Sequence, residues 1–226
     1  MSDGGVFITL EGGDGTGKST QIKLLQQALS AAGRDVMVTR EPGGTPQAER
    51  IRSLLLQRDS GAFDPMTEAL LLFAARREHL VNKIWPALGA GTWVVSDRFA
   101  DSSRAFQGYG MGLDLSVIEK LYTLVAGDFQ PDLTLIFDID PEAGLRRSMK
   151  HLSETQNAVE ATEDRYERMG LEFHRRLRDG FLTIARQNPA RCVVIDASVD
   201  VAAVHERVMA EVNARFGLHM PGAAHG

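Results

Sequence analysis

The sequence has little that would tie it to a membrane, an oxidising compartment or nucleic acid. Its 226 residues include one cysteine, so no internal disulfide can form. No apolar run approaches the roughly 18 residues needed to span a bilayer, and residues 1–5 lack the positive charge of a signal peptide. The formal charge of −5 argues against a general nucleic-acid coat, which needs a basic surface. We therefore expect a cytoplasmic protein without membrane or nucleic-acid partners.

What is present is ordinary globular composition, with 43% hydrophobic and 24% charged residues. The length fits one domain over residues 1–226. The lone Cys192 lies in an apolar run, which predicts a small core residue rather than a reactive thiol. Because the net charge is negative, any anionic ligand must be held by a local cluster of positive charge.

Short apolar runs alternate with longer helical patterns along the chain. The predicted strands cover residues 6–10, 35–39, 93–96, 133–138 and 192–196. The predicted helices cover residues 18–32, 46–57, 66–88, 115–126, 141–149, 166–187 and 201–216. Several strands are continuous apolar runs, as expected for a parallel sheet buried on both faces. The alternation predicts an α/β fold with right-handed crossovers.

Two segments stand outside this alternation. Residues 150–165 are polar and weakly periodic and lie between two helices, so they read as an exposed flap or as a plain surface loop. Residues 218–226 combine proline with several glycines and alanines, which predicts a frayed tail.

The strongest motif follows the first predicted strand. Residues 12–19 match Gly-x-x-x-x-Gly-Lys-Ser, with a strand before and a helix after. The glycines let successive backbone N–H groups point at phosphate oxygens, and the helix dipole adds positive potential. Lys18 is predicted to reach the β- and γ-phosphates, and the Ser19 hydroxyl to bind Mg²⁺. The predicted nucleotide-binding residues are Gly12, Gly13, Asp14, Gly15, Thr16, Gly17, Lys18, Ser19 and Thr20.

A second acid follows an apolar strand. Residues 93–96 run into Asp97 and Arg98, a Walker B pattern that places a carboxylate near the metal. Arg98 is a candidate phosphate ligand. The alternative is a helix-capping Asp whose neighbouring Arg pairs at the surface.

Several blocks in order along the chain resemble the thymidylate kinase family, over about residues 7–198. They are residues 11–20, 39–45, 72–77, 97–99, 103–108, 164–167 and 195–198. The resemblance implies a P-loop NTPase-type three-layer sandwich: a five-stranded parallel sheet flanked by helices, with a mobile lid at about 150–165. It also implies transfer of the γ-phosphoryl group of ATP to dTMP with Mg²⁺, giving dTDP and ADP in dTTP biosynthesis. A homodimer packed through helices is implied as well.

The resemblance assigns the nucleoside-binding residues. Phe73 matches a phenylalanine that stacks on thymine, and Arg77 matches an arginine that binds a thymine carbonyl. Without the resemblance, Phe73 is better interpreted as a core residue. Arg77 is equally well interpreted as a solvated arginine on an amphipathic helix. Ser103 and Gln107 match positions that touch base and sugar. Phe106 stands where many relatives have tyrosine, and its ring can still crowd a ribose 2′-hydroxyl.

Further matches surround the acceptor phosphate. Asp14 matches an acid that faces the sugar 3′-hydroxyl and the acceptor phosphate; on its own it is also a turn-forming residue. Arg40 and Arg98 match arginines near that phosphate, where guanidinium forks offset the repulsion between two anions. The remaining predicted substrate-binding residues are Glu41, Pro42 and Tyr166.

The source of the catalytic arginine differs among relatives. Some carry it in the P-loop at the residue after the acid, which is Gly15 here. We therefore expect the cation to come from the flap and choose Arg165, with Arg147 against the adenine. The flap itself is richer in acids than the basic pattern common in bacterial relatives.

Two kinds of rival remain open. Another nucleoside or nucleotide kinase would share the phosphate motif, and turnover of dTMP but not dAMP, dGMP or thymidine separates these. A P-loop switch or partitioning ATPase would hydrolyse ATP without an acceptor, so its ADP release would not respond to dTMP.

Overall fold

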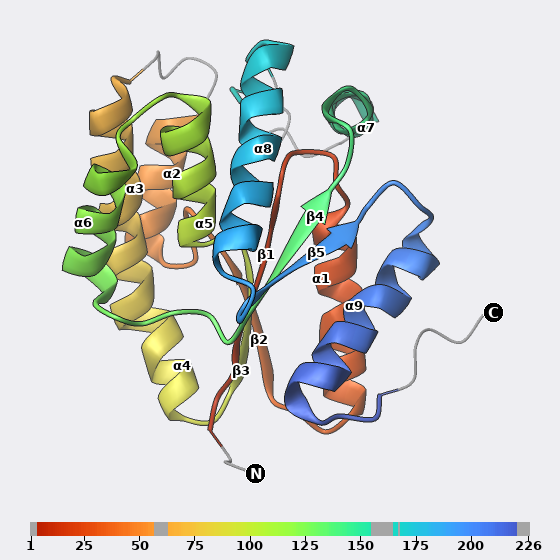
Figure 1. The fold of residues 1–226 in the computed structure, drawn as a ribbon. Helices are drawn as coiled ribbons and strands as arrows, with labels where there is room; N and C mark the ends of the chain where they lie inside the picture. Colours follow the sequence, from red (N-terminus) through yellow and green to blue (C-terminus); the bar gives the residue numbers. More distant parts are fainter. Residues whose placement is uncertain (1–3, 57–62, 155–164, 167, 221–226) are drawn as a thin grey trace.

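The computed structural model describes residues 4–56, 63–154, 165–166 and 168–220, and a parallel sheet forms its centre (Figure 1). The strands are β1 (Phe7–Gly12), β2 (Val36–Arg40), β3 (Trp93–Asp97), β4 (Leu133–Asp138) and β5 (Cys192–Asp196). They pair in parallel in the order β2-β3-β1-β4-β5. The predicted five-stranded parallel sheet is confirmed.

Burial on both faces explains the continuous apolar runs of the central strands. Every residue of β1 is buried, and β4 is buried except at its last residue. Since all strands run in one direction, their carboxyl ends meet at one edge of the sheet. There Gly12 pairs with Phe137, while Leu10 and Arg40 both pair with Asp97. This edge carries the phosphate motif and the second acid.

Helices α1 (Lys18–Ala31) and α9 (Val201–Phe216) cover one face of the sheet (Figure 1). Their buried faces meet the strands in one apolar cluster, in which Leu25 and Leu29 of α1 pack with Val208 and Val212 of α9. All four side chains are fully buried. The helix that follows the phosphate motif is therefore fixed from both sides.

The other face is covered by a larger group of helices, which completes the predicted three layers (Figure 1). These are α2 (Pro46–Leu56), α3 (Pro65–His79), α4 (Trp85–Gly89), α5 (Ala100–Ser103), α6 (Leu115–Ala126) and α8 (Leu171–Gln187). Phe73 of α3 and Tyr122 of α6 pack with Phe7 and Phe99. Helix α7 (Pro141–Glu154) follows β4 at the carboxyl edge.

The predicted helix over residues 66–88 is wrong in its continuity. Helix α3 ends at His79, a π-helical turn η2 (Leu80–Ile84) follows, and α4 begins at Trp85. Pro86 has no N–H to donate to the carbonyl four residues earlier, so an unbroken α-helical ladder cannot pass this point. The start of α3 is fixed by Asp64, whose carboxylate accepts from two backbone N–H groups of the first turn.

Other helix ends differ from expectation. Residues 100–110, which carried no predicted helix, form α5 and a π-helical segment η3 (Arg104–Gly110). Helix α7 continues to Glu154, whereas α8 begins only at Leu171. Gly170 precedes α8 in an extended conformation and so separates residues 165–166 from the helix.

Much of the predicted flap lies outside the described residues, namely 155–164. Of the predicted tail, 221–226 also lie outside them, whereas Met220 is buried and exchanges two hydrogen bonds with Asn213 of α9. The predicted fraying is therefore wrong for residues 218–220, which are held against α9 through Met220. Cys192 is buried, which raises the pKa of its thiol to about 12, as expected for a core cysteine.

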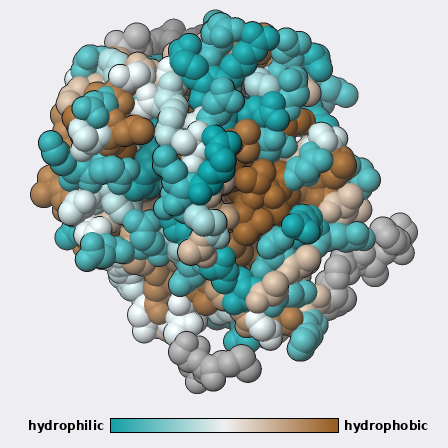
Figure 2. Space-filling model, in the orientation of Figure 1, coloured by the Kyte–Doolittle hydropathy of each residue, from teal (hydrophilic) through white to brown (hydrophobic). Residues whose placement is uncertain are grey.

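The surface adds two observations. Apolar side chains gather between α8 and α9 over the edge strand β5, whose Val194 is 39% exposed (Figure 2). Within the described ranges, no helix combines the length and apolar character needed to cross a bilayer.

Candidate active site

The loop between β1 and α1, here called the glycine loop (residues 12–20), curls because its glycines adopt backbone angles closed to other residues. Gly12 and Gly15 have φ of 131° and 69°. A Cβ at Gly12 would lie 2.4 Å from the Phe137 carbonyl oxygen, and one at Gly15 would lie 2.0 Å from that of Gly144. The first contact holds the loop against β4 and the second against α7. The loop therefore needs glycine for space as well as for conformation.

Lys18 lies folded into the glycine loop. Its ammonium donates to the carbonyl oxygens of Gly12 (3.1 Å) and Gly13 (2.6 Å) and to the Thr16 hydroxyl (3.1 Å). Burial, followed by the nearby Arg98 cation, lowers its pKa to about 8. The ammonium is therefore held within the glycine loop, where it can supply positive charge to an anionic ligand.

Ser19 and Asp97 form an oxygen pair beside the glycine loop. The Ser19 hydroxyl lies 3.5 Å from Asp97 Oδ2, while Asp97 Oδ1 is buried without a hydrogen-bond partner in the described part of the chain. The same residues contain no group of three or more His, Cys, Asp or Glu side chains suited to a metal. Mg²⁺ needs only one or two carboxylates, because it keeps waters and binds phosphate oxygens. The pair therefore fits a magnesium ion that arrives with a nucleotide.

Arg98 connects the glycine loop to the next cavity. Its guanidinium donates to Asp14 Oδ1 (2.6 Å), to the Gly12 carbonyl (2.8 Å) and to the Ser102 hydroxyl (3.2 Å). It also lies 4.9 Å over the Phe106 ring. The residue has a φ of 69°, which is rare outside glycine and strains the backbone at the end of β3.

Buried Glu11 supports this strained turn. Its two carboxylate oxygens accept from the Phe99 N–H (2.8 Å) and the Ser102 hydroxyl (2.6 Å), on either side of the segment that follows Arg98. Burial, with a smaller contribution from the Asp101 charge, raises the pKa of Glu11 to about 7.

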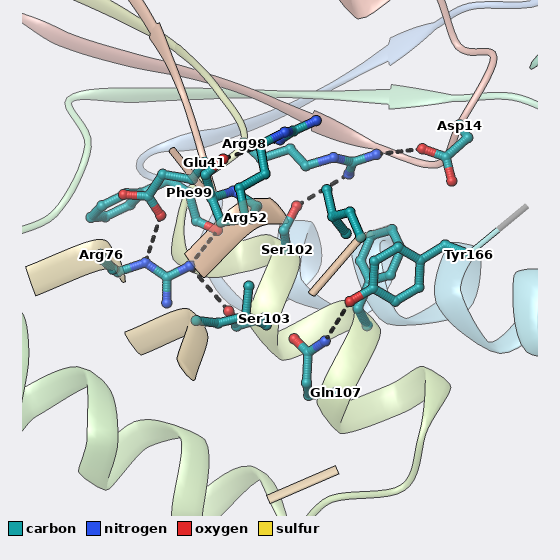
Figure 3. A pocket seen from close by; sticks show the side chains of 14 residues that line it. Asp14, Glu41, Arg52, Arg76, Arg98, Phe99, Ser102, Ser103, Gln107 and Tyr166 are labelled. Carbon is teal, nitrogen blue, oxygen red and sulfur yellow. Dashed lines mark hydrogen bonds and ion pairs between the residues drawn. The ribbon is translucent and has the colours of Figure 1, made fainter. Parts of the chain in front are cut away.

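A cavity opens directly beside the glycine loop and is called the acceptor cavity here (Figure 3). Its lining residues are Asp14, Glu41, Pro42, Arg52, Leu56, Leu72, Arg76, Arg98, Phe99, Ser102, Ser103, Phe106, Gln107 and Tyr166. Asp14 belongs to both sites, and its Oδ2 is buried with no hydrogen-bond partner among the described residues. The two sites are therefore continuous.

Arg76 of α3 brings a fixed donor to the acceptor cavity (Figure 3). Its Nε donates to Glu41 (2.7 Å) and its Nη2 donates to the Phe99 carbonyl (3.1 Å) and to Ser103 (3.0 Å). Its Nη1 is buried and finds no acceptor within the described chain; we call it the open donor. Glu41 is itself held by His79 Nδ1 at 3.1 Å. An arginine fixed on three sides cannot turn its remaining N–H groups away.

Gln107 of η3 brings a fixed acceptor. Its Nε2 donates to Glu68 Oε1 at 2.7 Å and lies 3.4 Å from the Tyr166 hydroxyl. Its Oε1 is buried and has no donor among the residues the structure describes; we call it the open acceptor. The Tyr166 hydroxyl also donates to Glu68 Oε1 (2.8 Å), and Glu68 Oε2 pairs with Arg165 (2.5 Å).

Comparison with known proteins finds similar sequences and a similar solved structure. The thymidylate kinase family model matches residues 10–208. A thymidylate kinase of Caulobacter vibrioides is 49% identical over 214 residues, covering 95% of this chain and 99% of the relative. One of Citrifermentans bemidjiense is 48% identical over 197 residues, covering 87% and 86%. The chain belongs to the thymidylate kinase family.

A solved structure agrees with this assignment. The crystal structure of thymidylate kinase from Ehrlichia chaffeensis superposes with a TM-score of 0.74 at 40% identity, covering 93% of this chain and 99% of that one. The chain is accordingly a kinase, a phosphotransferase of nucleotide biosynthesis. Among the alternatives raised by the sequence, a switch ATPase does not fit this membership.

Most predicted substrate residues of the kinase do line the acceptor cavity. They are Asp14, Glu41, Pro42, Arg98, Ser103, Phe106, Gln107 and Tyr166. Phe106 is 5% exposed, and its ring lies edge-on to that of Tyr166, 4.9 Å between centroids. The structure therefore brings together residues from positions 14 to 166 that the sequence could place only singly.

The expectations for Arg77 and Phe73 do not fit the kinase structure. Arg77 points away from the acceptor cavity: it donates to the Val125 carbonyl (2.8 Å) and lies 5.0 Å over the Trp85 ring. Phe73 is 2% exposed in the core, beneath the Arg76 guanidinium at 4.6 Å. One residue of helical rotation separates the two arginines, and the structure puts Arg76 in the cavity.

Three other predicted cations lie outside the acceptor cavity. Arg40 pairs with Glu49 at 3.0 Å, in a groove next to Ser19 and Asp97. Arg165 is bound by Glu68 and by the Leu55 carbonyl (3.2 Å), so its side chain is not directed at the glycine loop as a catalytic arginine would be. Arg147 donates to the carbonyls of Ala197 (2.9 Å) and Ser198 (3.3 Å).

Several lining residues of the kinase were not predicted, namely Arg52, Leu56, Leu72, Arg76, Phe99 and Ser102. A signal for Arg76 existed in the sequence. Arg76 lies four residues after Leu72 and three before His79, the spacing of one helix face, and all three are buried, whereas Arg77 is not among the buried residues of α3. The buried Glu68 was missed because a carboxylate in a helix normally indicates a solvated face.

Proposed function

We propose that this kinase binds ATP on the glycine loop and dTMP in the acceptor cavity, and transfers the γ-phosphoryl group to give dTDP and ADP. The observation that carries this proposal is the continuity of the two sites, which share Asp14 and are bridged by Arg98. Two nucleotides bound in this way meet end to end. The product serves the synthesis of dTTP.

The acceptor cavity suits a thymine base. Thymine offers a carbonyl acceptor at O4 and, beside it, an N–H donor at N3. The open donor of Arg76 and the open acceptor of Gln107 present the complementary pair. The Phe106 ring lines the same cavity under the Arg98 guanidinium, so it can contact the deoxyribose of a nucleotide whose phosphate Arg98 binds.

The anionic ends of both nucleotides need positive charge, because their phosphates repel each other. Lys18, the backbone N–H groups of the glycine loop and the α1 N-terminus supply it on the ATP side. Arg98 supplies it on the acceptor side, where Asp14 holds its guanidinium in place. Arg147, beside the 197–198 loop, is our candidate for contact with the adenine. Phosphoryl transfer of this kind depends mainly on such alignment and neutralisation.

We propose Ser19 and Asp97 as the residues that hold Mg²⁺. The buried and open Asp97 oxygen next to a hydroxyl supports this assignment. The ion, when bound, neutralises charge on the β- and γ-phosphates. The acceptor phosphate is ionised at neutral pH, so no side chain has to remove a proton from it.

We also propose that the kinase acts as a homodimer in the cytoplasm. Large apolar side chains are exposed on neighbouring helices, with Leu124 of α6 at 79% and Leu70 of α3 at 50%. Cytoplasmic action rests on the single buried cysteine. Sedimentation equilibrium that yields the mass of one chain across micromolar concentrations would refute the dimer.

A steady-state panel tests the function. With ATP and Mg²⁺, ADP release should require dTMP and should be much slower with dAMP, dGMP or thymidine. Chelation of Mg²⁺ should abolish it. ADP release that is indifferent to dTMP would refute the proposal, and fast turnover of thymidine would point to a nucleoside kinase.

A further inference from the structure

Glu68 is an acid that the proposed reaction does not use, yet it lies immediately behind the acceptor cavity. Its side chain belongs to the first turns of α3 and is fully buried. It has partners from two other segments: Gln107 of η3, and Tyr166 and Arg165 from the chain before α8. A buried carboxylate with this set of partners acts as an acceptor on every side.

This acceptor decides which end of the Gln107 amide faces the cavity. The two ends of an amide have nearly the same shape, so neighbouring groups determine its orientation. Glu68 Oε1 lies 2.7 Å from Gln107 Nε2, a distance that only the NH₂ end can satisfy favourably. The oxygen end therefore points away from Glu68 as the open acceptor, on a residue that lines the cavity and is 1% exposed (Figure 3).

The orientation of one amide bears on the choice of pyrimidine. Thymine presents O4 as acceptor and N3–H as donor, whereas cytosine presents its 4-amino group as donor and N3 as acceptor. Toward a base Arg76 can only donate, and Gln107, whose NH₂ is bound to Glu68, can only accept. Cytosine would bring a donor to the Arg76 donor and an acceptor to the Gln107 acceptor. Its binding would leave these buried polar groups unpaired, which strongly disfavours dCMP.

We propose that Glu68 is a positioning residue that holds the Gln107 oxygen toward the base and thereby makes the kinase select dTMP over dCMP. The inference rests on the proposed function, since it assumes that the base of the acceptor nucleotide meets Arg76 and Gln107. Glu68 itself touches no substrate.

The test substitutes Glu68→Gln, which preserves shape and removes the charge. Arg165 donates only, so the amide introduced at position 68 should keep its oxygen toward Arg165 and turn its NH₂ toward Gln107. Gln107 then turns over and presents NH₂ to the cavity, which suits N3 of cytosine. We expect the ratio of kcat/KM for dTMP to that for dCMP to fall about tenfold or more, the scale of one mismatched buried hydrogen bond.

A swap variant and a truncation make the result specific. In the double variant E68Q/Q107E the new carboxylate at position 107 accepts from the amide at position 68 and still offers an oxygen to the base. The ratio should return to within about threefold of the wild-type value, a recovery that repair of folding alone would not produce. Gln107→Leu keeps the Glu68–Arg165 pair and removes the open acceptor, so it should also lower the ratio. Glu172→Gln, at an exposed carboxylate paired with Arg175 on α8, is the matched control and should leave the ratio unchanged.

Binding of dTMP and dCMP measured by isothermal titration, beside thermal unfolding of each variant, completes the experiment. Equal losses for both nucleotides in E68Q, or no recovery in the swap variant, would overturn the inference. If E68Q does not fold, Q107L decides: an unchanged ratio there overturns it. Failure of the wild-type kinase to phosphorylate dTMP would instead overturn the proposed function, so the two failures are distinguishable.

Discussion

The glycine loop and the acceptor cavity are neighbours that share Asp14, but they are built in opposite ways. The loop consists of consecutive residues and works through its backbone, with even the Lys18 ammonium bound to its own carbonyls. The cavity has 14 lining residues, which come from the loop, α2, α3, α5, η3 and the chain at Tyr166, among other segments. It works through side chains that hold one another in place.

This contrast separates a general function from a specific one. Phosphate groups are the same in all nucleotides, so a short backbone motif is enough to bind them. A base must be distinguished by the direction of donors and acceptors, which requires groups fixed by second contacts such as Glu41 on Arg76 and Glu68 on Gln107. Substitutions should therefore fall into two classes, loss of rate in the loop and loss of selectivity in the cavity.

Lys18→Ala should remove the function of the glycine loop and have the largest effect on rate. The substitution removes the positive charge at the centre of the glycine loop, so we expect kcat to fall about 10²–10³-fold or more. The fold should remain, since the ammonium contacts only loop carbonyls and the Thr16 hydroxyl within the described chain. Coupled assay of ADP release and circular dichroism measure the two quantities. Lys120→Ala on the exposed side of α6 is the control, and an equal loss there would contradict the assignment.

A comparison of Arg76→Lys with Arg77→Lys tests which arginine serves the acceptor cavity. Lysine keeps the charge but loses the planar fork that bridges Glu41, Phe99 and Ser103. A lost hydrogen bond to a charged group is worth about 1.5–3 kcal/mol, so kcat/KM for dTMP should fall about 10–150-fold. The KM for ATP should hardly change. Arg77→Lys should stay within about twofold in both, and an equal loss in the two variants would remove the distinction between these neighbours.

The fold was accessible to sequence reasoning where the pattern is local and repeated. Five apolar runs matched five strands, because a strand buried on both faces leaves a continuous apolar signature. The break of the 66–88 helix could not be predicted from the sequence. Pro86 marks a possible break, but a proline can either kink a helix or end it. The helical segment at 100–110 depends on packing against α8, which no local pattern reveals.

The same distinction between local patterns and long-range contacts applies to the site. The glycine loop could be predicted from eight residues because the groups that bind phosphate follow one another in the chain. In the acceptor cavity, the choice between Arg76 and Arg77 depended on the rotation of α3, and the role of Glu68 depended on partners 39 and 98 positions away in the chain. Where a contact joins distant segments, the residue type alone carries no record of its partner.

Glu11 lies at the boundary between the two regions. It belongs to the strand that enters the glycine loop, and its carboxylate holds the turn after Arg98 that borders the acceptor cavity. Its carboxylate is fully buried, and this burial raises its pKa from 4.5 to about 7. An acid whose pKa is higher in the folded state keeps its proton there while the unfolded chain has already lost it.

Glu11→Gln should therefore change thermal stability by an amount that depends on pH. The contribution of Glu11 to the free energy of unfolding is fully present below pH 4.5 and is lost as pH rises through about 7. Glutamine resembles the protonated acid and does not titrate, so its melting temperature relative to wild type should rise between pH 5 and pH 8. The gain should be at most a few kcal/mol, at ~1.4 kcal/mol for each pKa unit, or about 2–4 °C for each kcal/mol. Thermal unfolding at both pH values, with Glu172→Gln as control, measures it. A difference that does not change with pH would mean that the carboxylate between the two regions is as readily ionised as one in water.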